Sequence, residues 1–126
     1  MTKSDVYFIT ASGTGAMESA IVNTTSPGDN ILSISIGWFG QRFGDISDAY
    51  GCKTTRLEFE SGEPADPEKV KKEILKNNNY KAVLITHNES SSGVRNPLRE
   101  ICEVIKNNSI YIYSFKHFIL TGTMST

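Results

Sequence analysis

The hydrophobic residues of this chain change their spacing along the sequence, and the changes predict alternating strands and helices. Runs rich in β-branched residues predict strands at residues 6–10, 30–36, 53–58, 82–86 and 110–113. Apolar residues three or four positions apart predict helices at residues 16–22, 39–50, 67–76 and 97–107. Strands that alternate with helices over short connections favour a three-layer α/β/α domain with a mostly parallel sheet of about five strands.

Three polar or glycine-rich loops follow predicted strands, at residues 11–15, 37–42 and 88–93. The carboxyl ends of parallel strands meet at one edge of a sheet, and ligands of such folds bind at that edge. We therefore expect the three loops to lie close together and to form one site.

The first loop has the order strand, glycine-rich turn, helix, which suits the binding of an anion. Glycines let the backbone approach a ligand closely, and the first amides of a helix have no partner within the helix. The helix dipole adds partial positive charge, and the hydroxyls of Ser12 and Thr14 can donate hydrogen bonds. We interpret Ser12, Gly13 and Thr14 as a phosphate cradle, although the pattern alone also fits a turn that starts a helix and binds nothing.

Composition and charge narrow the classes of function. The chain has 126 residues and a net charge of −1, without a stripe of Lys and Arg, so we expect no nucleic-acid partner. No apolar run is long enough to span a membrane, and the polar residues 1–5 do not lead into a signal peptide. Cys52 and Cys102 lie far apart and no His or Cys pair has metal-ligand spacing, so we expect reduced cysteines, no metal site and a cytoplasmic protein.

Four motifs follow one another in the chain, and their order is more specific than any one of them. They are ASGTGAME at residues 11–18, SPGD at 26–29, GWFGQR at 37–42 and THNESSSGV at 86–94, followed by Asn96-Pro97. Together they resemble the class V aminotransferase family, especially its alanine–glyoxylate and serine–glyoxylate branch. The resemblance covers residues 6–105. It implies a fold-type I large domain that binds pyridoxal 5'-phosphate and transfers an amino group between a small amino acid and a 2-oxo acid.

The resemblance also implies which residues hold the cofactor. Ser12, Gly13 and Thr14 match the family's motif for the cofactor phosphate. Phe39 matches an aromatic residue that stacks on the pyridine ring, and Trp38 beside it takes this role if the register shifts by one residue. Core packing remains the alternative for both aromatic side chains.

The third loop carries the remaining residues with an implied role. Ser90 matches the family's residue near the cofactor ring, within hydrogen-bond reach of its oxygen. We expect Glu89 to brace the loop, His87 to be a hydrogen-bonded structural group, and Gln41 and Arg42 to orient the second loop or its neighbours. The family builds its active site at a dimer interface, which implies a homodimer.

The chain departs from the family pattern near its C-terminal end. The family carries an aspartate beside the pyridine nitrogen, at a position that counting places near Phe115, but residues 110–118 contain no acid. The family's Schiff-base lysine has no match, since Lys116 lies outside the pattern. We therefore identify no catalytic residue. We interpret residues 1–126 as a single partial domain that is inactive alone, from a truncated or frameshifted gene, with a divergent tail at 109–126.

Two other readings remain open from the sequence. Gly13 and Gly15 could begin the fingerprint of a nucleotide-binding α/β module, but Glu18 stands where that fingerprint has a third Gly or Ala. The strand that ends at Ser35 and Ile36 also lacks the acid that would bind a ribose. The chain could instead be a non-catalytic partner of a full-length homologue, bound through the dimer surface.

Overall fold

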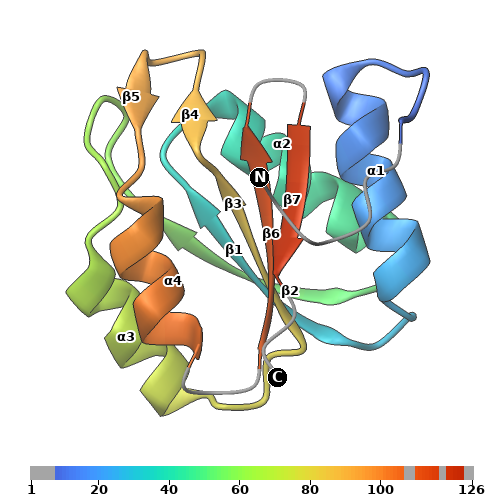
Figure 1. Ribbon diagram of the computed structural model, residues 1–126. Coiled ribbons are helices and arrows are strands. Elements are labelled where there is room, and N and C mark those ends of the chain that lie inside the picture. Colours follow the sequence, from blue (N-terminus) through green and yellow to red (C-terminus); the bar gives the residue numbers. More distant parts are fainter. Residues whose placement is uncertain (1–7, 107–109, 117–118, 124–126) are drawn as a thin grey trace.

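A five-stranded sheet in the order β2-β1-β3-β6-β7 forms the centre of the molecule. The computed structural model describes residues 8–106, 110–116 and 119–123 (Figure 1). The strands are β1 (Asn30–Ser35), β2 (Lys53–Glu58), β3 (Ala82–Thr86), β6 (Tyr111–Lys116) and β7 (Ile119–Thr123). Strands β2, β1, β3 and β6 are parallel, whereas β7 pairs antiparallel with β6. The predicted α/β fold with a mostly parallel sheet is therefore confirmed.

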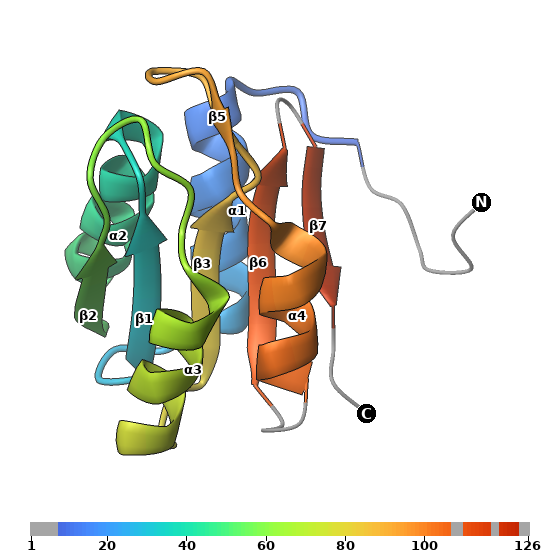
Figure 2. The ribbon, with the colours of Figure 1, turned by 90° about the vertical axis from the view of Figure 1, so that its left-hand side faces the viewer.

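Two helices cover each face of the sheet (Figure 2). One face carries α1 (Gly13–Thr24) and α2 (Trp38–Ala49), and the other carries α3 (Pro67–Lys76) and α4 (Leu98–Lys106). In β3, Leu84 packs into the cluster of apolar side chains under α1 and α2, whereas Val83 and Ile85 pack into the cluster under α3 and α4. Burial on both faces explains why β3 is a continuous apolar run rather than an alternating one.

Small residues bring α2 close to β1. A Cβ added to Gly40 would lie 2.9 Å from the Cα of Ser35, and one added to Gly44 would lie 3.0 Å from the Oγ of Ser33. A side chain at either glycine would therefore push the helix away from the sheet. This close packing holds the start of α2 against the carboxyl end of β1.

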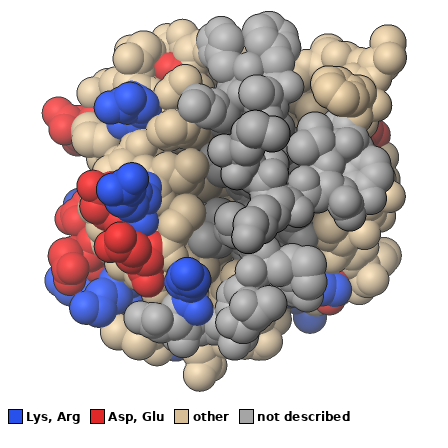
Figure 3. Space-filling model, viewed as in Figure 1, with Lys and Arg blue, Asp and Glu red and all other residues tan. Residues whose placement is uncertain are grey.

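Most of the predicted elements are present. The strands at 53–58 and 82–86 and the helix at 67–76 have the predicted bounds. Asp66 caps α3, because its carboxylate accepts a hydrogen bond from the Glu68 N–H at 2.9 Å. The exposed surface over α3 and α4 carries charged residues of both signs (Figure 3).

The strand predicted at residues 6–10 is wrong for the described residues 8–10, which adopt neither helix nor strand. Phe8 is 97% exposed, and Ile9 is exposed as well. Residues with high β propensity form a strand only where they pair with another strand. Residues 8–10 extend past β7 and do not pair with it (Figure 2). Residues 6 and 7 lie outside the described residues.

The structure also contains elements that the sequence pattern does not predict. The last strand continues to Lys116, and β7 follows it as an antiparallel neighbour. The polar loop at 88–96 contains a short antiparallel pair, β4 (Asn88–Glu89) and β5 (Val94–Arg95). Two-residue strands are too short to show a hydrophobic period, so only pairing geometry identifies them.

Candidate functional site

The three predicted loops meet at the carboxyl edge of the sheet, at the top of Figure 1. The start of α1 is joined to α2 by a hydrogen bond from Arg42 Nη1 to Thr14 Oγ1 at 3.1 Å. The start of α2 is joined to the third loop by a hydrogen bond from the Trp38 N–H to Ser91 Oγ at 3.1 Å. The structure therefore places the three loops side by side: the second and third follow the parallel strands β1 and β3, and the first is held beside them by its hydrogen bond to α2.

Ser12 shapes the first loop, because it is the N-cap of α1. Its Oγ accepts a hydrogen bond from the Gly15 N–H at 3.2 Å, and its carbonyl accepts one from the Ala16 N–H at 3.1 Å. A Cβ on Gly15 would lie only 2.8 Å from the Cβ of Ala11, so the tight turn requires glycine there. The first turn of α1 contains no acidic residue, which leaves the positive end of its dipole without a counter-charge from its own turn.

The hydroxyls of Ser12 and Thr14 both act as hydrogen-bond acceptors within the protein. Each oxygen already accepts a hydrogen bond from the protein, Ser12 from the Gly15 N–H and Thr14 from Arg42. Within the described part of the chain, neither hydroxyl donates one. A hydroxyl with its acceptor side in use has its O–H proton left for an acceptor such as a phosphate oxygen.

The free amides at the start of α2 are hydrogen-bonded to a carboxylate of the protein itself. Glu89 is fully buried and accepts hydrogen bonds from the Phe39 N–H at 3.2 Å and the Gly40 N–H at 3.0 Å. The Ser91 hydroxyl lies 2.6 Å from the Glu89 Oε1, and the Thr86 hydroxyl lies 3.3 Å from Oε2. Glu89 therefore caps α2 from another loop and braces the junction, so α2 does not offer a second anion site.

The two aromatic residues of the second loop differ in their surroundings. Phe39 is half-buried and packs against the apolar cluster under α1 and α2. Trp38 is 51% exposed, meets the edge of Phe39 at a ring-centroid distance of 5.1 Å, and carries the Arg42 guanidinium 4.3 Å from its own ring centroid. Phe39 thus takes part in core packing, and its stacking on a cofactor ring stays a prediction.

The third loop places Ser90 on the exposed turn between β4 and β5. The sequence analysis gave no role to Asn96, which is buried and anchors the base of this loop. Its side-chain amide donates to the Thr86 carbonyl and accepts from the Ala65 N–H, both at 2.8 Å. An Asn directly before Pro97, after a polar loop, is the only sequence signal that could have indicated this anchor.

A hollow of about 380 Å³ lies at the opposite, amino end of the sheet. Its polar lining includes Asp29 and Lys81, whose charged atoms lie 2.8 Å apart. The hydrogen bond from Lys81, and then that from the Ser26 N–H, holds the pKa of Asp29 below its usual range. This ion pair joins the start of β1 to the start of β3 and contacts none of the three loops.

A search of the described residues finds no helix long and apolar enough to cross a membrane. The same residues contain no group of three or more His, Cys, Asp or Glu side chains that could hold a metal ion.

The comparisons with known proteins agree with the fold and the loops. The family model described as aminotransferase class-V matches residues 1–114. An uncharacterised aminotransferase of Methanocaldococcus jannaschii is 46% identical over 113 residues, which are 89% of this chain and 29% of that protein. The serine–glyoxylate aminotransferase of Methylorubrum extorquens is 34% identical over 106 residues, covering 82% of this chain and 26% of that enzyme.

Solved structures give the same result. The ureidoglycine–glyoxylate aminotransferase of Bacillus subtilis superimposes with a TM-score of 0.77 at 29% identity, covering 81% of this chain and 26% of that one. The fold is that of the large domain of fold-type I aminotransferases. The chain belongs to the class V aminotransferases. It spans less than a third of the length of these relatives.

Proposed function

We propose that this chain is the part of a class V aminotransferase that holds the phosphate of pyridoxal 5'-phosphate. In this proposal the parent enzyme transfers an amino group between a small amino acid and a 2-oxo acid. The observation that carries the proposal is the polarity of the start of α1. Two hydroxyls, the first amides of the helix and the positive end of the helix dipole come together there, and all of them favour a hydrogen-bond acceptor with negative charge.

The residues present fit the phosphate group of this cofactor. The donor set consists of the Ser12 and Thr14 hydroxyls and the Gly13 and Thr14 amides, which suits an anion with three acceptor oxygens. The tight turn at Gly15 keeps these donors together. Phe39 and Ser90 are the residues that we expect beside the cofactor ring, from the second and third loops.

The cofactor, when bound, would supply the electron sink for amino-group transfer. The chain's own contribution is to bind the phosphate and orient the ring. Strand β6 occupies the place beside β3, with Phe115 paired to Thr86, and residues 111–116 contain no carboxylate to hold a proton on the ring nitrogen. We therefore propose that the 126-residue chain alone does not catalyse transamination.

The proposal includes a cytoplasmic homodimer, as the family resemblance implies. Sedimentation of the purified chain tests the dimer, with a monomer at all concentrations as the contradicting result.

The nucleotide-binding alternative receives less support. Glu18, at the position where a dinucleotide fingerprint has a small residue, accepts a hydrogen bond from the hydroxyl of Tyr50, the C-cap residue of α2. The Glu18 side chain thus connects α1 to the end of α2 on the same face of the sheet. In the fingerprint, the small residue at this position lets the helix pack closely against a strand, which is a different role.

Binding of the cofactor to the purified chain tests the proposal directly. Pyridoxal 5'-phosphate is measured by equilibrium dialysis, with inorganic phosphate added as a competitor. We expect phosphate to displace it, and Ser12→Ala to weaken its binding by at least about tenfold through loss of one hydrogen bond to a charged group. Ser61→Ala, in an exposed loop, is the matched control. Binding that is unaffected by phosphate and by Ser12→Ala would contradict the proposal.

A further inference from the structure

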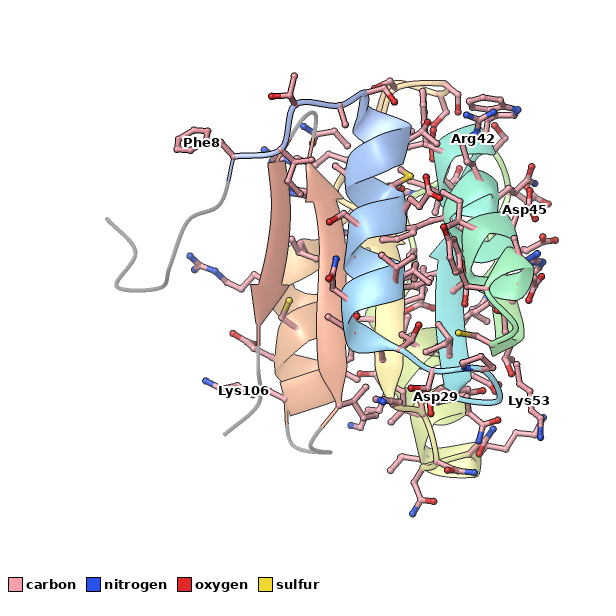
Figure 4. All side chains as sticks on the ribbon, turned by 90° about the vertical axis from the view of Figure 1, so that its right-hand side faces the viewer. Phe8, Asp29, Arg42, Asp45, Lys53 and Lys106 are labelled. Atoms are coloured by element: carbon pink, nitrogen blue, oxygen red, sulfur yellow. The ribbon has the colours of Figure 1, made fainter. Side chains whose placement is uncertain are left out.

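Arg42 lies where the first and second loops meet. Its position in the first turns of α2 places it beside the start of α1, at the loop edge of the molecule (Figure 4). Its Nη1 donates to Thr14 Oγ1 at 3.1 Å, and its guanidinium lies over the Trp38 ring at 4.3 Å. The guanidinium is therefore held by two contacts, with an aromatic face and with a residue of the predicted cradle.

Arg42 forms no ion pair with an Asp or Glu in the described part of the chain. The ion pairs there join Arg56 to Asp45 and Asp48, and Lys81 to Asp29. The buried carboxylate of Glu89 is occupied by the amides at the start of α2. A half-buried arginine without an acidic partner keeps its positive charge available to an anion that binds nearby.

The hydrogen bond to Thr14 determines the direction in which that hydroxyl can act. Because its oxygen accepts from a cation, the Thr14 hydroxyl is polarised and its own proton is left to donate. An anion at the start of α1 would then accept a hydrogen bond from Thr14. It would also be attracted by the positive charge of the guanidinium next to Thr14. Cation–π contact with Trp38 holds the guanidinium in this place.

We propose that Arg42 is a positioning residue of the phosphate cradle, which holds the Thr14 hydroxyl as a donor and balances the charge of the bound phosphate. The proposal rests on the proposed function, because it concerns the same cradle. It assigns to Arg42 a part in ligand affinity rather than only the orientation of a loop.

The test is titration of the full chain with inorganic phosphate, followed through the amide resonances of residues 13–15. We expect Arg42→Gln to weaken phosphate binding about tenfold, as for a lost hydrogen bond with a charged partner. Arg42→Lys retains the charge and should recover most of the affinity. Arg56→Gln is the control, because it removes an equal charge on β2. It should change the affinity for phosphate less than about twofold at physiological salt, where this charge is screened.

A double-mutant cycle shows whether Arg42 acts through Thr14. Thr14→Val removes the hydroxyl without altering α2, and we expect it to weaken binding by a similar factor. The double variant should bind only slightly more weakly than either single variant, because both remove the same hydrogen-bonded unit. The affinity should also depend less steeply on salt in Arg42→Gln, which a loss of shape alone would not produce.

Three outcomes separate the two proposals. Wild-type binding that Arg42→Gln and Arg42→Lys leave unchanged would overturn the role of Arg42 and leave the cradle standing. Fully additive losses in the double variant would overturn the route through Thr14. A folded wild-type chain that binds no phosphate would overturn the cradle and the role of Arg42 together. If Arg42→Gln fails to fold, Thr14→Val and Arg42→Lys give the answer.

Discussion

Glu89 provides the sharpest test of how the loop edge is held together. It is fully buried, and it is the acceptor for two amides at the start of α2. In Glu89→Ala, the Gly40 N–H loses its partner in a buried position, and the Phe39 N–H loses its partner in a half-buried one. Loss of a helix cap costs about 0.5–2 kcal/mol, and each buried donor left unpaired costs about 1–3 kcal/mol.

These two costs describe the same lost bonds and therefore do not add in full. Removing a buried charge also relieves its desolvation, which offsets part of the loss. We expect Glu89→Ala to lower the free energy of unfolding by about 3 kcal/mol. Glu89→Gln retains one acceptor oxygen but turns an NH₂ group towards a helix amide. We expect this variant to lower the free energy of unfolding by about 1–2 kcal/mol.

Urea unfolding followed by circular dichroism measures the free energy of unfolding of both variants. The dependence of that free energy on urea concentration, the m-value, is held at the wild-type value in the comparison. Glu103→Ala, at an exposed position of α4, is the control and should stay within about 0.5 kcal/mol of wild type. If Glu89→Ala is unfolded without urea, Glu89→Gln provides the measurement. A loss below about 1 kcal/mol in Glu89→Ala would refute the assignment of this carboxylate as the cap of α2.

Four further predictions follow from the packing and the charges. Gly44→Ala should lower the free energy of unfolding by about 1–3 kcal/mol, because its Cβ would overlap the Arg56 guanidinium and lie 3.0 Å from Ser33 Oγ; urea unfolding measures this. Because Lys81 keeps the pKa of Asp29 low, this pair stabilises the fold above about pH 4 and ceases to do so as the pH falls through the lowered pKa. Asp29→Asn should remove the pH-dependent contribution of this pair to the free energy of unfolding. We expect that contribution to be less than about 1 kcal/mol because the pair is partly exposed, and urea unfolding from pH 2 to 7 measures it. The wild-type chain should show no sharp, reversible thermal transition above about 60 °C, since residues 8–10 leave apolar side chains exposed and β7 is the last described strand of the sheet; calorimetry checks this. Borohydride reduction with pyridoxal 5'-phosphate, followed by peptide mapping, should label surface lysines at a low level, and alanine and glyoxylate should not turn over; one stoichiometrically labelled lysine together with turnover would contradict the expected inactivity.

The sequence predicted the elements whose causes are local. Asp66 before Pro67 marks the start of α3 within one turn of chain, and the apolar run at 82–86 gives β3 its bounds. Ser12 and the glycines after it likewise indicate a capped helix start in a few residues. Parallel topology places the second and third loops at one edge without any knowledge of side-chain contacts, because they follow β1 and β3. The first loop follows no strand of the sheet, so this argument does not place it.

The features that escaped prediction depend on residues far apart in the chain. Glu89 caps a helix that begins about 50 positions earlier, and no pattern near either residue shows this. Arg42 was expected to orient the second loop or its neighbours, and its hydrogen bond to Thr14 fits this, but the sequence did not identify Thr14 as its partner. Residues 8–10 have the composition of a strand, yet composition does not say whether a neighbouring strand is present to pair with them.

The central claim is that the start of α1 binds a phosphate group, and the most direct measurement is an amide NMR titration of the wild-type chain. Pyridoxal 5'-phosphate and inorganic phosphate are added separately to millimolar concentration. The account predicts saturable shifts of the Gly13, Thr14 and Gly15 amides with both ligands, and shifts near Phe39 with the cofactor only. A well-dispersed spectrum in which residues 12–15 do not move with either ligand would contradict it.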